Sequence, residues 1–303
     1  MSLALQVLVT GVAAGAVYGL VGFGFTLVYR LARVLPFAHG DLVTGAVFTA
    51  VLAVIGSTPV AVDAGPAESV VLVVVATVTG AALSAATYVV AIRPFMGVDV
   101  IGWAVGGIAA GLLVRAVLGL ALPAQAYAVP DPLHLGGVAR LPGGATVPVH
   151  LVGVAVAGVA AGLAADWYAT RSRSGRGMRA VAEDPEAAML VGVPVRRVRL
   201  GAFVLAGALA GLAGLLYAPG HSLALDAGVI LGLKGAAAAL LGGLGSVRGA
   251  LVGGLVLGVV EQAAVTSPVL GAGFADVLAL GVLVVLLAVR PEGLRSTYRT
   301  AVE

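Results

Sequence analysis

Apolar runs of about 20 residues recur along this chain, and they constrain its fold more than any other sequence feature. Of the 303 residues, 60% are hydrophobic and only 10% are charged. A helix of about 20 residues crosses the roughly 30 Å hydrocarbon core of a bilayer, where every backbone polar group must be bonded within the protein. The sequence therefore predicts an all-α, polytopic membrane protein, with a single transmembrane domain over residues 1–303.

We expect eight or nine membrane segments. The second and seventh are short, and the seventh either spans the bilayer or re-enters it. The first lacks a positively charged start and is too long for a signal-peptide core, so it is expected to remain as a span. The nine segments run approximately over Leu5 to Tyr29, Asp41 to Ile55, Ala67 to Ile92, Ile101 to Leu122, Val149 to Ala169, Leu200 to Ala218, Ala227 to Leu241, Gly249 to Val265 and Gly271 to Val289.

The arginines predict the orientation, because loops rich in Lys and Arg stay in the cytoplasm. With the amino terminus outside and the carboxyl terminus inside, only Arg140 falls outside, in the Pro- and Gly-rich residues 123–148. We expect these residues to form an exterior loop with short strands. The arginines expected inside are Arg30, Arg33, Arg93, Arg171, Arg173, Arg176, Arg179, Arg196, Arg197, Arg199, Arg248, Arg290, Arg295 and Arg299.

Residues 171–199 form the most charged interior stretch, and within it DPEAAMLVG has its own helix signals. Asp184 suits an N-cap, Pro185 the first helical position, Glu186 the positive end of the helix dipole, and Gly192 a left-handed exit. The predicted helix is about two turns long, and its residues Ala187, Leu190 and Val191 share a face. Two interpretations stay open: a loop whose arginines fix topology, or a docking element ordered by a partner.

Three stretches carry a resemblance to a known family: LPFAHGDLVTGAVF, the region from GRGMRAVAEDPEAAMLVG to AGLLY, and GLKGAAAALLGGLGSVRGALVGGLVLGVVEQ. In this order they resemble the branched-chain amino acid permeases of ATP-binding-cassette importers, specifically the LivH type. Pro36, where Asn is usual, and Arg248, where Pro is common, depart from the pattern.

The resemblance implies a bacterial inner-membrane subunit that imports branched-chain or related small amino acids; relatives also carry urea or short amides. Its partners would be two ATPase subunits, a homologous second permease and an extracytoplasmic substrate-binding protein. EAAMLVG matches the family loop that docks into the ATPase. The residues expected to couple to the ATPase are Arg179, Glu183, Asp184, Glu186, Ala187, Ala188 and Gly192.

The sequence itself contains neither an ATP-binding motif nor a recognisable catalytic site. Lys234, the only lysine, follows Leu233 and not Gly, so no P-loop is present. Cysteine is absent, the four histidines show no metal-ligand spacing, and no nucleophile-and-base pattern or nucleic-acid-binding motif occurs. We therefore expect no enzyme activity, cofactor, metal or nucleic-acid partner, with ATP hydrolysis on a separate chain.

Helix breaks are expected at Pro36 and Gly40 and at the glycines 242, 243 and 245, and residues near them are candidates for the translocation path or gate. His39 is interpreted as a structural histidine or a gate, and Lys234 as structural or path-lining. Arg115 is expected to snorkel to the exterior, while Glu261 pairs with a cation or approaches the exterior. An ion-coupled secondary transporter or channel using His39, Asp41 or Glu261 remains the alternative function. The full set of path or gate candidates is Phe37, His39, Gly40, Asp41, Lys234, Gly242, Gly243 and Gly245.

Overall fold

The computed structural model describes residues 2–56, 65–96, 100–123, 125–140, 146–267 and scattered positions between 273 and 288. The ninth predicted segment, Gly271 to Val289, therefore lies mostly outside the described residues. The helices are α1 Ser2–Ala32, α2 His39–Ile55, α3 Pro66–Ala86, α4 Val100–Ala121, α5 Val149–Arg171, α6 Arg173–Glu183, α7 Pro185–Leu190, α8 Val195–Tyr217, α9 Ala227–Gly242 and α10 Val247–Val265.

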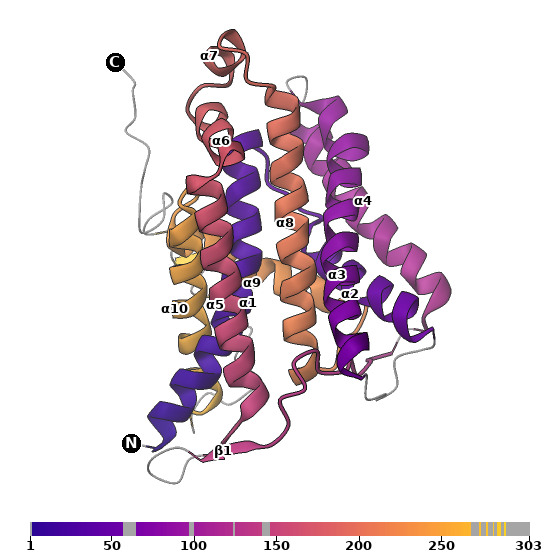
Figure 1. The fold of residues 1–303 in the computed structure, drawn as a ribbon, viewed down its shortest axis with the longest axis vertical. Coiled ribbons are helices and arrows are strands. Elements are labelled where there is room, and N and C mark those ends of the chain that lie inside the picture. The colour runs from indigo at the N-terminus through magenta and orange to yellow at the C-terminus, as the bar shows by residue number, and fades with distance from the viewer. Residues whose placement is uncertain are drawn as a thin grey trace.

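Most helices run along one long axis of the molecule (Figure 1). The short helix α7 projects at one end, which we call the α7 end, and the amino terminus lies at the opposite end. Six helical stretches of the described chain are long and apolar enough to cross a membrane; they contain α1, α3, α4, α5, α8 and α10. Helices α2 and α9 are apolar but only 17 and 16 residues long, so the short length predicted for the second and seventh segments is confirmed.

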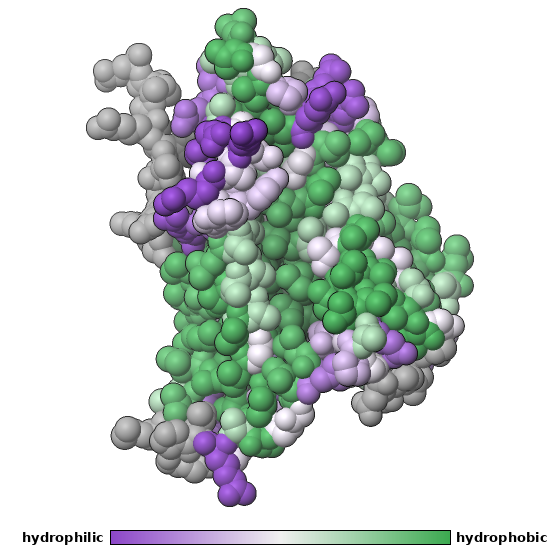
Figure 2. Space-filling view, viewed as in Figure 1, coloured by the Kyte–Doolittle hydropathy of each residue, from purple (hydrophilic) through white to green (hydrophobic). Residues whose placement is uncertain are grey.

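Helix α3 continues into a π-helical turn, η1 Thr87–Ile92, and a 3-10 turn, η2 Arg93–Phe95. The side chains that α3 and α4 turn outward are large and apolar, among them Val70, Leu113 and Leu120, which is 89% exposed. They belong to a broad hydrophobic surface between the charged end regions (Figure 2). In water such a surface would be costly, so this belt is suited to lipid.

Glycines let the helix backbones touch. A Cβ atom added at Gly15 of α1 would lie 2.7 Å from the carbonyl oxygen of Gly254 in α10. At Gly22 it would lie 2.8 Å from the carbonyl oxygen of Gly235 in α9. Small residues allow this approach in lipid, where apolar burial between helices gives little driving force. These glycines therefore allow close packing of α1 against α9 and α10.

The loop at the opposite end from α7 holds two short antiparallel strands, β1 Val138–Arg140 and β2 Thr146–Pro148. Tyr127 joins the loop to the bundle: its backbone pairs with Leu223, after the 3-10 turn η3 Ala218–Gly220 that follows α8. The Tyr127 hydroxyl donates to the Pro123 carbonyl at 2.7 Å, and the residue is only 1% exposed. The short strands predicted within residues 123–148 are thus confirmed.

Candidate functional site

Helix α6 is attached to the end of α5 by side-chain caps. Ser172 accepts a hydrogen bond from the Gly175 backbone N–H at 2.8 Å, which caps the first turn of α6. Arg179 donates to the Thr170 carbonyl and, at 3.3 Å, to that of Ala169. A guanidinium at this position satisfies carbonyl acceptors that have no helical partner. Its positive charge is also stabilising at the carboxyl end of α5, which is the negative end of the helix dipole. Arg179, predicted to couple to an ATPase, therefore fixes the base of the α6–α7 segment.

Helix α7 begins and ends as its sequence predicts. The Asp184 carboxylate accepts from the backbone N–H groups of Glu186 at 2.8 Å and Ala187 at 3.0 Å. Pro185 occupies the first helical position, and Gly192 turns the chain with φ of 82°. A left-handed residue after a short helix is where glycine is favoured. The predicted N-cap, first residue and glycine exit are all confirmed.

The tip of α7 exposes apolar side chains at the far end of the molecule. Leu190 is 89% exposed, Val191 78% and Met189 56%. Figure 2 shows this apolar tip beyond a zone of strongly hydrophilic residues. Of the residues predicted to couple, Glu183, Asp184, Glu186, Ala187 and Gly192 are exposed. Ala188 is buried and packs against the core, so it supports the tip from inside.

The start of α2 lies deep in the bundle. His39 packs against Gly24, eight residues before the end of α1, so α2 starts about 12 Å below that end. The imidazole of His39 is 1% exposed and meets Phe25 edge-on with ring centroids 5.1 Å apart. Its Nε2 has no hydrogen-bond partner among the described residues. The structural interpretation of His39 agrees with this burial and with the hydrogen bond of its ring to the Val21 backbone.

The neighbours of His39 divide into packed and outward-facing residues. Gly40 touches the backbone of Gly228, so the starts of α2 and α9 meet without side chains between them. Phe37, in contrast, is 47% exposed and stacks on Trp103 of α4 with centroids 6.2 Å apart.

Asp41 forms an ion pair with Arg115 of α4. The expectation that Arg115 snorkels to the exterior is therefore wrong in this structure. The Asp41 carboxylate, in the first turn of α2, is close enough to neutralise the guanidinium inside the bundle. A paired cation has a lower free energy at this depth than an unpaired one. The pairing of Asp41 with Arg115 could not be predicted from sequence spacing, because 74 residues separate them.

A second buried pair joins α9 to α10. Lys234 Nζ donates to Glu261 Oε1 at 2.9 Å, and the side chains are 5% and 7% exposed. The Tyr18 hydroxyl of α1 donates to the same oxygen at 3.1 Å and lies 3.3 Å from Nζ. Glu261 thus pairs with a cation, one of the two outcomes left open by the sequence. Tyr18, which gave no signal in the sequence, ties three helices through this cluster.

The turn between α9 and α10 is made by the predicted helix-breaking glycines. Helix α9 ends at Gly242, and Gly243 and Gly245 have φ of 87° and 105°. Gly242 lies against the backbone of Gly249 in α10, so neither position has room for a side chain. Ser246 then caps α10 by accepting from the Gly249 N–H at 3.1 Å. The predicted break is confirmed, and its glycines turn the chain tightly at the α7 end.

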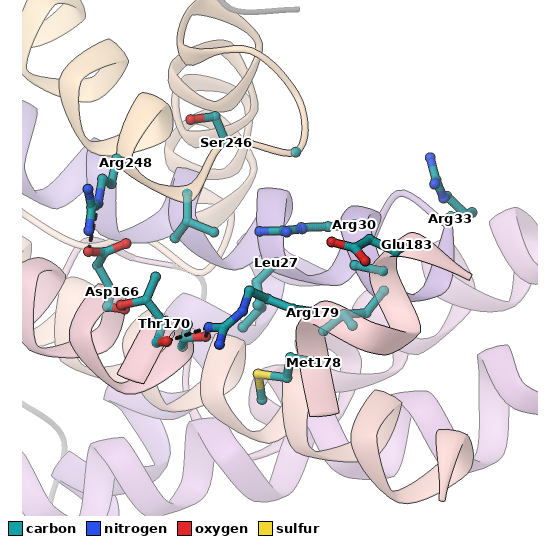
Figure 3. Close-up of a pocket in the computed structure, with 15 residues that line it drawn as sticks. Leu27, Arg30, Arg33, Asp166, Thr170, Met178, Arg179, Glu183, Ser246 and Arg248 are labelled. Carbon is teal, nitrogen blue, oxygen red and sulfur yellow. Dashed lines mark hydrogen bonds and ion pairs between the residues drawn. The ribbon is translucent and has the colours of Figure 1, made fainter. Parts of the chain in front are cut away.

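A cavity of about 470 Å³ opens beside this turn. The ends of α1 and α5, helix α6 and the start of α10 surround it (Figure 3). Arg248 Nε donates to Asp166 Oδ2 at 2.9 Å across one side. Gly245, from the predicted path set, lines the cavity, whereas Asp166 and Arg30 were not identified as site residues from the sequence. The long apolar helices and the ion pairs buried between them define a polytopic helical membrane protein.

The chain belongs to the family described as branched-chain amino acid transport system / permease component, whose sequence model matches residues 7–287. BraD, a high-affinity branched-chain amino acid transport system permease protein of Pseudomonas aeruginosa, is 29% identical over 294 residues, covering 96% of this chain and 95% of BraD. LivH of Escherichia coli K12, of the same description, is 29% identical over 300 residues, covering 96% and 94%. The L-arabinose permease protein AraH of Azospirillum brasilense matches at 38% over only 96 residues.

The fold also resembles a solved structure. PsaBC from Streptococcus pneumoniae, solved with a Fab, aligns with a TM-score of 0.50, 14% identity and coverage of 96% of this chain and 93% of that chain. The family and its full-length relatives make this chain the permease subunit of an ATP-binding-cassette importer in the inner membrane. ATP hydrolysis belongs to separate subunits, and a substrate-binding partner completes such systems.

Proposed function

We propose that the α7 end faces the cytoplasm, with the amino terminus outside and eight or nine crossings in all. The hydrophilic surface around α6 and the start of α8 supports this orientation, because arginines concentrate there (Figure 2). In the loop of residues 123–148, at the opposite end, Arg140 is the only arginine or lysine in the sequence. This asymmetry follows the rule that positively charged loops remain inside.

Helix α7 is the element that docks onto a separate ATPase. The observation that carries this proposal is the exposure of Leu190, Val191 and Met189 beyond the hydrophilic zone, where lipid does not cover them. Exposed apolar residues rimmed by charge are typical of protein interaction sites. A tip of this kind, on a helix too short to be stable alone, suits insertion into a partner's groove.

The α6–α7 segment transmits the movement of that ATPase to the bundle. Arg179 bonds the end of α5, and Ala188 packs on the core, so displacement of α7 pulls on both. ATP binding and hydrolysis on two ATPase subunits would then switch access through the permease. A homologous second permease subunit completes the path on the other side. The remaining coupling residues, Glu183, Asp184, Glu186, Ala187 and Gly192, form or cap the contacting surface.

The substrate is a branched-chain or related small amino acid, by analogy with BraD and LivH, which are described as permeases of branched-chain amino acid transport. The gate lies where the starts of α2 and α9 meet, around Phe37, His39, Gly40 and Asp41. Lys234 holds α9 against α10 beside it, and Gly242, Gly243 and Gly245 form the pivot between the two helices.

Co-purification in mild detergent tests the proposed docking. We expect P-loop ATPases to be recovered with this chain in stoichiometric amount, and to be lost with Glu186→Lys while membrane insertion is unchanged. Gly192→Trp should act in the same way, because a bulky side chain would occupy the exposed exit of α7. Ion-driven uptake by the purified chain alone, or normal ATP-coupled uptake in both variants, would refute the proposal.

Binding of amino acids by the partner binding protein tests the substrate separately. Calorimetry should show tight binding of leucine, isoleucine or valine and weak binding of urea or acetamide. Preference for urea or short amides would overturn the substrate assignment and leave the docking proposal unaffected.

A further inference from the structure

The cavity of about 470 Å³ at the α7 end is unusually basic. Four arginines line it, Arg30, Arg33, Arg179 and Arg248, together with the carboxylates of Asp166 and Glu183. Guanidinium groups therefore outnumber carboxylates two to one in a space enclosed by four helices. Docking of an ATPase at α7 gives no reason for this excess of positive charge, because the cavity lies behind the tip.

Among the described residues, the ion pairs within the cavity leave Arg30 without a carboxylate partner. Asp166 is engaged by Nε of Arg248, whose side chain remains 69% exposed. Arg179 donates to carbonyl oxygens of α5, and it forms no ion pair with a carboxylate of the described residues. Arg30 is half-buried and has no ion-pair partner among the described residues. Figure 3 shows its side chain extending through the space between the Ser246 turn and α6.

The depth of the cavity matches the surface of a membrane. Arg30 lies in the last turn of α1, and Asp166 lies five residues before the end of α5. The apolar belt ends at this level and the hydrophilic zone begins (Figure 2). Basic pockets between membrane helices at this level bind the head groups of anionic lipids.

We propose that the cavity binds a phosphate group, carried by an anionic phospholipid or by a soluble phosphate compound. Arg30 and Arg248 are the principal ligands, because a planar guanidinium can donate two parallel hydrogen bonds to phosphate oxygens. The first turn of α10, at Ser246 and Val247, adds the positive end of its dipole. The bound phosphate joins α1 to α10 beside α6, at the base of the segment that leads to α7.

Native mass spectrometry of the full chain tests the lipid source. Protein purified in micelles with equal amounts of phosphatidylglycerol and phosphatidylcholine should retain phosphatidylglycerol selectively. Arg30→Gln/Arg248→Gln should lower that retention about tenfold, as expected for two lost charge-assisted contacts. Arg197→Gln is the matched control, since it removes an exposed arginine outside the cavity at the same end of the bundle, and it should retain lipid as the wild type does.

Inorganic phosphate tests the soluble source in lipid-depleted micelles at constant ionic strength. A rise in melting temperature for the wild type and Arg197→Gln, absent in the double variant, supports a soluble phosphate ligand. Equal lipid retention in all three proteins together with equal phosphate response overturns the proposal. Should the double variant fail to fold, Arg30→Lys replaces it: weaker retention supports the phosphate site, because lysine lacks the planar fork, and unchanged retention overturns it. None of these outcomes depends on the transported substrate or on ATPase docking.

Discussion

A Cβ atom added at Gly15 would lie 2.7 Å from the carbonyl oxygen of Gly254, whereas one added at Gly192 would meet no described atom within 4 Å. Gly15 belongs to the bundle, where α1, α9 and α10 touch through their backbones. Gly192 ends α7, which is held by caps and by one buried alanine, Ala188. The difference shows that the bundle completes its own packing, while α7 leaves most of its surface for another molecule.

The bundle should lose its folded structure when a side chain is placed between helix backbones that are in contact. Gly15→Val places branched carbons against Leu255 and Gly254, where backbone atoms cannot rotate away. The cost should exceed the about 1–3 kcal/mol of ordinary overpacking, so we expect almost no monodisperse protein on size-exclusion chromatography. Gly119→Val is the control, because no described atom lies within 4 Å of that position. Normal yield of Gly15→Val would mean that α1 and α10 are not in contact.

The buried pair of Lys234 and Glu261 should also be essential to the bundle. Lys234→Met leaves the buried Glu261 carboxylate, which is 5% exposed, with the Tyr18 hydroxyl as its one remaining hydrogen-bond donor among the described residues. Breaking a buried pair costs about 3–5 kcal/mol, so the melting temperature in detergent should fall strongly. Adding Glu261→Gln should recover part of the loss, because a neutral amide is less costly to bury than an unpaired carboxylate. Equal melting of Lys234→Met and wild type would contradict the pairing.

Two leucines with exposed side chains distinguish the lipid belt from the docking tip. Leu113→Asp in α4 should cost about 2.5–3.5 kcal/mol of insertion free energy, because the carboxylate would face hydrocarbon. Leu190→Asp in α7 should insert normally but weaken ATPase binding by about 30-fold, equivalent to about 2 kcal/mol for an interface anchor. Insertion assays and co-purification measure the two effects. An insertion defect in Leu190→Asp would place the tip against lipid.

Local signals in the sequence were sufficient to predict the beginnings and ends of elements. Asp184, Pro185 and Gly192 act within α7 through contacts a few residues away, so their roles follow from spacing alone. The two short apolar helices and the glycine break after Gly242 were predicted for the same reason. The six long helices follow from hydropathy, which depends only on the neighbours within each segment.

Contacts between distant segments could not be predicted in this way. Arg115 was expected to snorkel because it lies about seven residues from the exterior end of its predicted span, whereas Asp41 is brought to it only by the packing of α2 on α4. Tyr18 sits in an apolar run without any polar neighbour that would mark its bond to Glu261. The basic cavity is likewise assembled from four separated segments, so spacing along the chain could not show that its arginines lie together.

The smallest expected effect lies at the cap of α7. Asp184→Ala removes the acceptor for the N–H groups of Glu186 and Ala187, which should destabilise the helix by about 1 kcal/mol. Hydrogen exchange at these two amides should become faster, while the melting temperature of the bundle stays unchanged because the cap makes no contact with it. Asp184→Asn, which keeps an acceptor oxygen, is the matched control. A fall in bundle stability would show that α7 is part of the packed core, and the contrast between the two regions would then disappear.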